Sequence, residues 1–153
     1  MINFLKKILK RETPRKIEET AFTPSQLQLA ISMILVRTAK IDDEFHILER
    51  NKIHELVLEY FKISNEEASE LLLLAENEEK IAIDLYSYTN IIKKEIPLEE
   101  RKNILKMMWQ IIITDQNFDP YENNLVWRVA ELIGINTRER VKIKKDFLKN
   151  TNE

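Results

Sequence analysis

The fold is decided by residues 111–122, which read IIITDQNFDPYE. When the chain is shifted by 73 positions, residues 38–49, TAKIDDEFHILE, fall on this stretch. Both stretches have the same spacing of an aspartate, a phenylalanine and a glutamate, namely Asp42, Phe45 and Glu49 against Asp115, Phe118 and Glu122. The sequence therefore predicts an internal duplication, in which each copy is a helix, an acidic loop and another helix.

The composition predicts a single all-α domain. The 153 residues include one glycine, four prolines and no cysteine, and 44% of them are hydrophobic. A chain of this size can bury a core without disulfides or structural metals. So few turn-forming residues are typical of helices joined by short polar loops. The lack of cysteine excludes disulfides, thiol nucleophiles and zinc-thiolate sites.

Periodicity and capping signals predict a compact bundle of about seven helices. We expect a basic amphipathic N-terminal helix and linker at residues 1–22, the helical domain at 23–149 and a short tail at 150–153. The helices of the domain are expected at about 23–40, 47–61, from Ser64, 81–94, from Pro97, from Asp119 to Gly134, and 136–149.

Several side chains carry these helix predictions. Thr23 with Gln26 and Ser64 with Glu67 match the capping box, and Gly134 suits a left-handed helix end. Ile81 is expected on the core face of the 81–94 helix. Four aromatic residues fall at helical spacing among aliphatic ones, which favours core packing over an exposed binding platform; they are Trp109, Trp127, Tyr86 and Tyr88.

Residues 111–122 and the helix after them, from Leu125 to Gly134, resemble the TerB family of tellurite-resistance proteins. The resemblance lies in a long helix, an acidic loop and a second helix, occurring twice over roughly residues 25–148. Asp43 and Gln116 replace the family's usual loop glycine, and His46 stands where the second copy has Asp119. The first copy is therefore the weaker candidate site.

The resemblance implies an acidic cluster that holds a hard cation such as calcium or magnesium, which prefers carboxylate oxygens. Its candidate ligands are Asp115, Asp119, Glu122, Asp42 and Glu49. Helix capping is the alternative, because Asp119 and Glu122 form a capping box with Pro120 in the first turn. The sequence leaves both readings open.

Other chemistries find little support in the residues. Pro120 replaces the glycine that an EF-hand loop requires, and Val126 stands at the position of its last glutamate. His46 and His54 lack the spacing of a zinc motif. One glycine allows no phosphate-binding loop, so we expect no catalytic site and no certain cofactor.

Charge is distributed unevenly along the chain. Residues 1–16 carry six Lys or Arg against one Glu, residues 138–153 carry six against three acids, and the net charge is −2. The rest of the chain, residues 17–137, is acidic, which argues against nucleic-acid binding. The last helix aligns Arg138, Lys142, Lys145 and Lys149, which favours a solvated basic face.

The basic N-terminal helix either covers the core or lies on an anionic membrane surface. No apolar stretch is long enough to span a membrane, and no signal peptide is evident, so we expect a cytoplasmic protein, peripheral at most to the inner membrane face. The expected function is a non-enzymatic, TerB-like stress-response accessory protein with a protein partner. The alternative is a helical interaction module.

Overall fold

The computed structural model describes residues 22–40, 47–114 and 120–151. Within these ranges the chain forms helices and no strand, which confirms the all-α prediction. The helices are α3 (Gln26–Ala39), α4 (Ile47–Phe61), α5 (Asn65–Ile81), α6 (Tyr86–Glu95), α7 (Leu98–Thr114), α8 (Pro120–Leu132) and α9 (Thr137–Thr151). The predicted N-terminal helix lies outside the described residues. None of the described helices is both long and apolar enough to cross a membrane.

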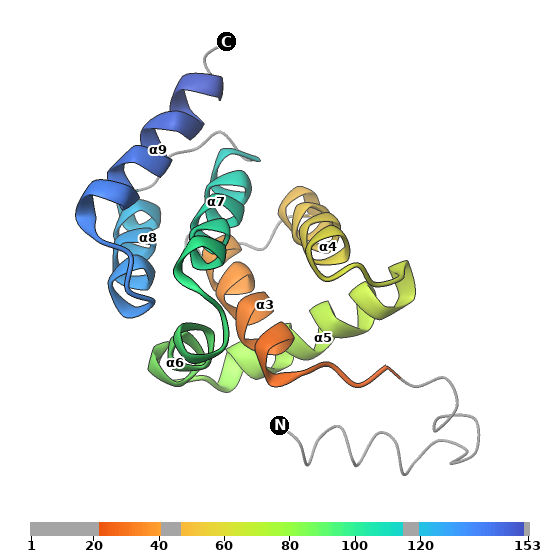
Figure 1. The fold of residues 1–153 in the computed structure, drawn as a ribbon. Helices are drawn as coiled ribbons and strands as arrows, with labels where there is room; N and C mark the ends of the chain where they lie inside the picture. The colour runs from red at the N-terminus through yellow and green to blue at the C-terminus, as the bar shows by residue number, and fades with distance from the viewer. Residues whose placement is uncertain (1–21, 41–46, 115–119, 152–153) are drawn as a thin grey trace, which may run out of the picture.

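Helix α3 forms the centre of the fold (Figure 1). It packs against α4, α5, α6 and α7, while α8 packs on α6 and α7, and α9 packs on α7. Every residue from Leu29 to Val36 is buried, so the helix has no solvent-facing side over this length. A helix that is apolar all round is stable only when neighbours surround it.

The start of α3 differs from the predicted one. Ser25, not Thr23, is the N-cap: its hydroxyl accepts from the Gln28 backbone N–H at 3.0 Å, and Gln28 Oε1 accepts from the Ser25 N–H at 2.9 Å. The sequence offers two overlapping Ser/Thr-x-x-Gln patterns, and packing decides between them. Pro24 is buried in the extended segment before the helix, which shifts the helix start past it.

The predicted helix at residues 81–94 is wrong at its N-terminal end. Helix α5 continues to Ile81, residues 82–85 are not helical, and α6 begins only at Tyr86. The Asp84 carboxylate accepts from the Tyr86 backbone N–H at 2.9 Å, and this local bond competes with an earlier helix start. Ile81 is consequently 72% exposed rather than part of the core.

The core prediction for the aromatic residues is confirmed in part. Trp109 is 2% exposed, and Tyr88 is half-buried and packs against the core. Trp127 is 44% exposed and Tyr86 is 64% exposed, so the prediction is wrong for these two. Helical spacing identifies the face a residue shares with others but does not say whether another helix covers that face.

Two helices end in the same way at positions that the predicted duplication pairs once a one-residue gap brings Ile63 onto Ile135. Lys62 after α4 has φ 55° and Gly134 after α8 has φ 82°. The following residues donate backbone hydrogen bonds five positions back, from Ile63 to Leu58 at 3.2 Å and from Ile135 to Ala130 at 2.8 Å. This is the bond pattern of a Schellman motif. It confirms the left-handed helix end that the sequence predicted at Gly134.

We expect opposite stability changes at these two ends. Gly134→Ala places a Cβ at a positive φ and 3.2 Å from the Arg101 guanidinium. It should lower the free energy of unfolding by about 1–2 kcal/mol. Lys62→Gly removes the same backbone strain and should raise that free energy by up to about 1 kcal/mol.

Urea denaturation of both variants tests this expectation. Equal destabilisation by both substitutions would contradict the shared helix-end geometry.

Candidate functional site

Glu49 and Glu122 occupy equivalent positions in the first turns of α4 and α8 and are both buried. Their exposed fractions are 2% and 3%. Other first-turn acids are not buried: Glu67, which forms the predicted capping box with Ser64, is half-buried, and Glu66 and Glu99 are exposed. Burial therefore distinguishes Glu49 and Glu122 from these other first-turn acids.

The other three candidate ligands, Asp42, Asp115 and Asp119, lie outside the described residues, as does His46. Within the described ranges, no group of three or more acidic or histidine side chains is placed to hold a metal ion. The structure therefore positions Glu49 and Glu122 only, and the convergence of all five carboxylates remains a prediction.

His54 Nε2 lies 3.2 Å from both the Asn65 carbonyl and the Ser69 hydroxyl, which gives it a structural role.

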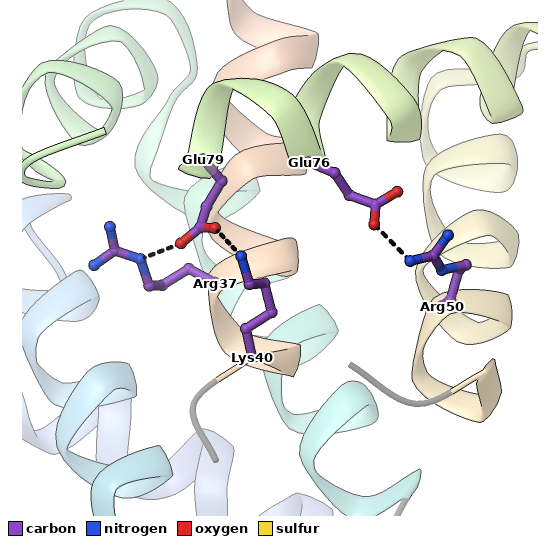
Figure 2. Close-up of polar contacts among 5 residues, drawn as sticks. All are labelled: Arg37, Lys40, Arg50, Glu76 and Glu79. Atoms are coloured by element: carbon purple, nitrogen blue, oxygen red, sulfur yellow. Dashed lines mark hydrogen bonds and ion pairs between the residues drawn. The ribbon is translucent and has the colours of Figure 1, made fainter. Parts of the chain in front are cut away.

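Two glutamates of α5, Glu76 and Glu79, form ion pairs with the two helix ends that flank residues 41–46 (Figure 2). We call this set of ion pairs the α5 clamp. Its Glu79 carboxylate accepts from Arg37 Nε at 2.8 Å and from Lys40 Nζ at 2.7 Å, both from the last turn of α3 and the residue after it. One turn earlier, Glu76 accepts from Arg50 of α4 at 2.6 Å. Glu79 is only 9% exposed, so its two bonds are partly shielded from water and stronger than surface ion pairs.

The second copy lacks this clamp. The 73-residue shift places Gln110, Ile113 and Asn123 at the positions of Arg37, Lys40 and Arg50. The Asn123 side-chain oxygen instead accepts from Lys144 Nζ of α9 at 3.0 Å. The same ammonium lies 5.6 Å from the centre of the Trp109 ring.

A pocket of about 320 Å³ opens at this place, between α7, α8 and α9. Its walls are Trp109, Ile112, Pro120, Glu122, Asn123, Lys144 and Leu148. Helices α8 and α9 both pack on α7 but make little contact with each other. The pocket lies between these two weakly contacting helices.

Other charged side chains on the surface are either exposed to solvent or form ordinary ion pairs. The four basic residues aligned on α9, Arg138, Lys142, Lys145 and Lys149, are all exposed, as expected of a solvated face. Lys102 of α7 bonds Glu99 at 3.0 Å and pairs with Glu139 of α9 at 3.4 Å. The hydrogen bond with Glu99 raises the pKa of Lys102.

Two tyrosines have raised pKa values. Burial, and then the negative charge of Glu100, raises the pKa of Tyr60. Burial, followed by the charges of Glu78 and Asp84, raises the pKa of Tyr88. Both phenols therefore stay protonated at neutral pH and act as packing groups rather than as bases.

The sequence analysis missed the α5 clamp and the pocket. A signal for the clamp exists: Arg37 and Lys40 are three residues apart, as are Glu76 and Glu79, so each pair lies on one helix face. Nothing in the sequence alone says that these faces meet. The pocket depends on the separation of α8 from α9, which no local pattern specifies.

We expect Glu79→Gln to lower the free energy of unfolding by about 1–3 kcal/mol, because it removes a buried charge bonded to Arg37 and Lys40. Glu95→Gln, at an exposed position of α6, should change it by less than about 0.5 kcal/mol. Thermal or urea unfolding measures both. Equal effects would show that the clamp contributes nothing beyond surface charge.

Comparison with known protein families gives a match over most of the chain. The family model described as Tellurite resistance protein TerB matches residues 28–145, which span α3 to α9. No curated protein and no solved structure matches the chain.

Proposed function

The chain belongs to the TerB family, and on that premise we propose that it is a non-enzymatic stress-response accessory protein that binds a divalent cation at its acidic loops. The burial of Glu49 and Glu122 at equivalent positions carries this proposal. Calcium and magnesium prefer carboxylate oxygens, and the two buried glutamates occupy equivalent places directly after the two acidic loops.

The second loop is the stronger candidate of the two. Asp115, Asp119 and Glu122 supply three carboxylates there, whereas His46 replaces one of them in the first copy. Calcium or magnesium suits such oxygen ligands, and either ion would act on binding or folding rather than on catalysis. Tellurite resistance is the label of the family, and the activity proposed for this chain is cation-dependent stabilisation of the acidic loops.

We expect millimolar calcium or magnesium to raise the melting temperature. At a cation concentration a hundred times the dissociation constant the gain is about 2.7 kcal/mol. For a domain of this size that corresponds to roughly 5–10 °C. The double variant Asp115→Asn/Glu122→Gln should lose this response in a thermal-shift assay.

Glu67→Gln is the matched control, because Glu67 caps a helix start outside the acidic loops. It should lower the melting temperature slightly but keep the full response to the cation. Absence of any shift at millimolar metal in the unmodified protein would overturn the cation proposal.

The alternative is a helical interaction module that docks a protein partner or the inner membrane surface. One observation favours it: large apolar side chains are exposed where α5 meets α6, namely Ile81 at 72%, Ile83 at 96% and Tyr86 at 64%. Exposed apolar groups close together in the chain are typical of contact surfaces. The basic residues 1–16 would add attraction to anionic lipids.

Co-sedimentation with anionic liposomes, with and without residues 1–16, tests the membrane part of this alternative. The full chain should pellet with the vesicles at low salt, and the truncated chain should stay in the supernatant. Equal binding of both chains would dismiss the N-terminal anchor.

A further inference from the structure

The pocket between α7, α8 and α9 contains a cation, Lys144, for which the described part of the chain provides no anionic partner. Lys144 lines the pocket, and its ammonium donates to the neutral Asn123 amide at 3.0 Å and lies over the Trp109 ring. Among the described residues, no carboxylate lies within ion-pair distance of Lys144. A charged acceptor stabilises a half-buried ammonium most, and the hydrogen bond of Lys144 here goes to a neutral amide.

A second donor belongs to Trp109, which also lines the pocket. Trp109 is 2% exposed, and its indole N–H has no hydrogen-bond acceptor in the described part of the chain. Pro120, Glu122 and Asn123 come from the first turn of α8, where the helix dipole favours negative charge. The negative charge of Glu122 would repel an anionic ligand. At 3% exposure, however, its carboxylate is largely shielded from the pocket.

The rest of the lining is apolar. Ile112 and Leu148 face the same space as the Trp109 ring, so a ligand needs an apolar body as well as an anionic end. The volume of about 320 Å³ lies at the small end of the range of roughly 300–1,000 Å³ seen for ligand pockets. That volume selects a short molecule over a long-chain lipid.

We propose that this pocket binds a small amphipathic carboxylate, with its carboxylate on Lys144 and its hydrocarbon part against Trp109, Ile112 and Leu148. The site does not depend on the cation proposal. Glu122 borders both proposed sites, but the ligand's carboxylate is assigned to Lys144 and the cation to the acidic loop, so the two ligands are tested separately.

The test uses the full chain with Trp127→Phe, which leaves Trp109 as the only tryptophan. Octanoate and phenylacetate are titrated in the presence of EDTA while the fluorescence of Trp109 is followed. Both should produce a saturable change, while octylamine, with the same number of carbons as octanoate and the opposite charge, should produce none. Persistence of binding in EDTA separates this outcome from that of the cation proposal.

Lys144→Met should weaken octanoate binding by about tenfold or more, the loss expected for one charge-assisted hydrogen bond. Lys145→Met is the matched control, because Lys145 is the next residue of α9, has the same charge and is exposed. It should change binding by less than about twofold. Lys144→Arg should keep most of the affinity, which separates charge from a folding defect.

Two results would overturn the proposal. One is the lack of any saturable change with octanoate or phenylacetate at millimolar concentration. The other is equal weakening by Lys144→Met and Lys145→Met, which would indicate general attraction to the basic helix.

Discussion

The burial of α3 on all sides is the constraint on which the rest of the structure depends. Eight consecutive residues from Leu29 to Val36 have no access to solvent, so α4, α5, α6 and α7 must all surround this helix. Two polar residues of α3 are also buried, Ser32 and Thr38, and the Thr38 hydroxyl donates to the Ile34 carbonyl at 2.8 Å within the helix. With α3 enclosed, α8 and α9 can attach only through α6 and α7, and they form the less tightly packed side of the molecule.

Local chemistry made some elements predictable from the sequence and left others open. The Ser64 cap and the end of α8 at Gly134 were predicted, because each rests on bonds between residues close in the chain. The start of α3 was not, since two overlapping capping patterns compete and the burial of Pro24 selects one of them. The exposure of Trp127 likewise depends on which helix covers α8, and that is a property of the tertiary arrangement.

In the candidate site, too, some features were predictable from the sequence and others depend on the tertiary arrangement. Sequence comparison between the two copies identified Glu49 and Glu122 as equivalent, but it could not reveal that both carboxylates are buried. Their burial distinguishes them from Glu66 and Glu99, which occupy first turns in the same chemical setting and are exposed. The pocket beside Glu122 was also beyond sequence reasoning, because its lining comes from three helices at separations of up to 39 positions.

The clamp formed by Glu76 and Glu79 has a consequence for the segment between α3 and α4. By holding Lys40 and Arg50 against one turn of α5, it fixes the two ends of residues 41–46 relative to each other. The folded protein has then already lost the chain entropy needed to bring those ends together, and a ligand need not supply it again. Among the described residues that flank 115–119, no such pair of ion pairs is present, so the two acidic segments would bind the same ligand with different entropic costs.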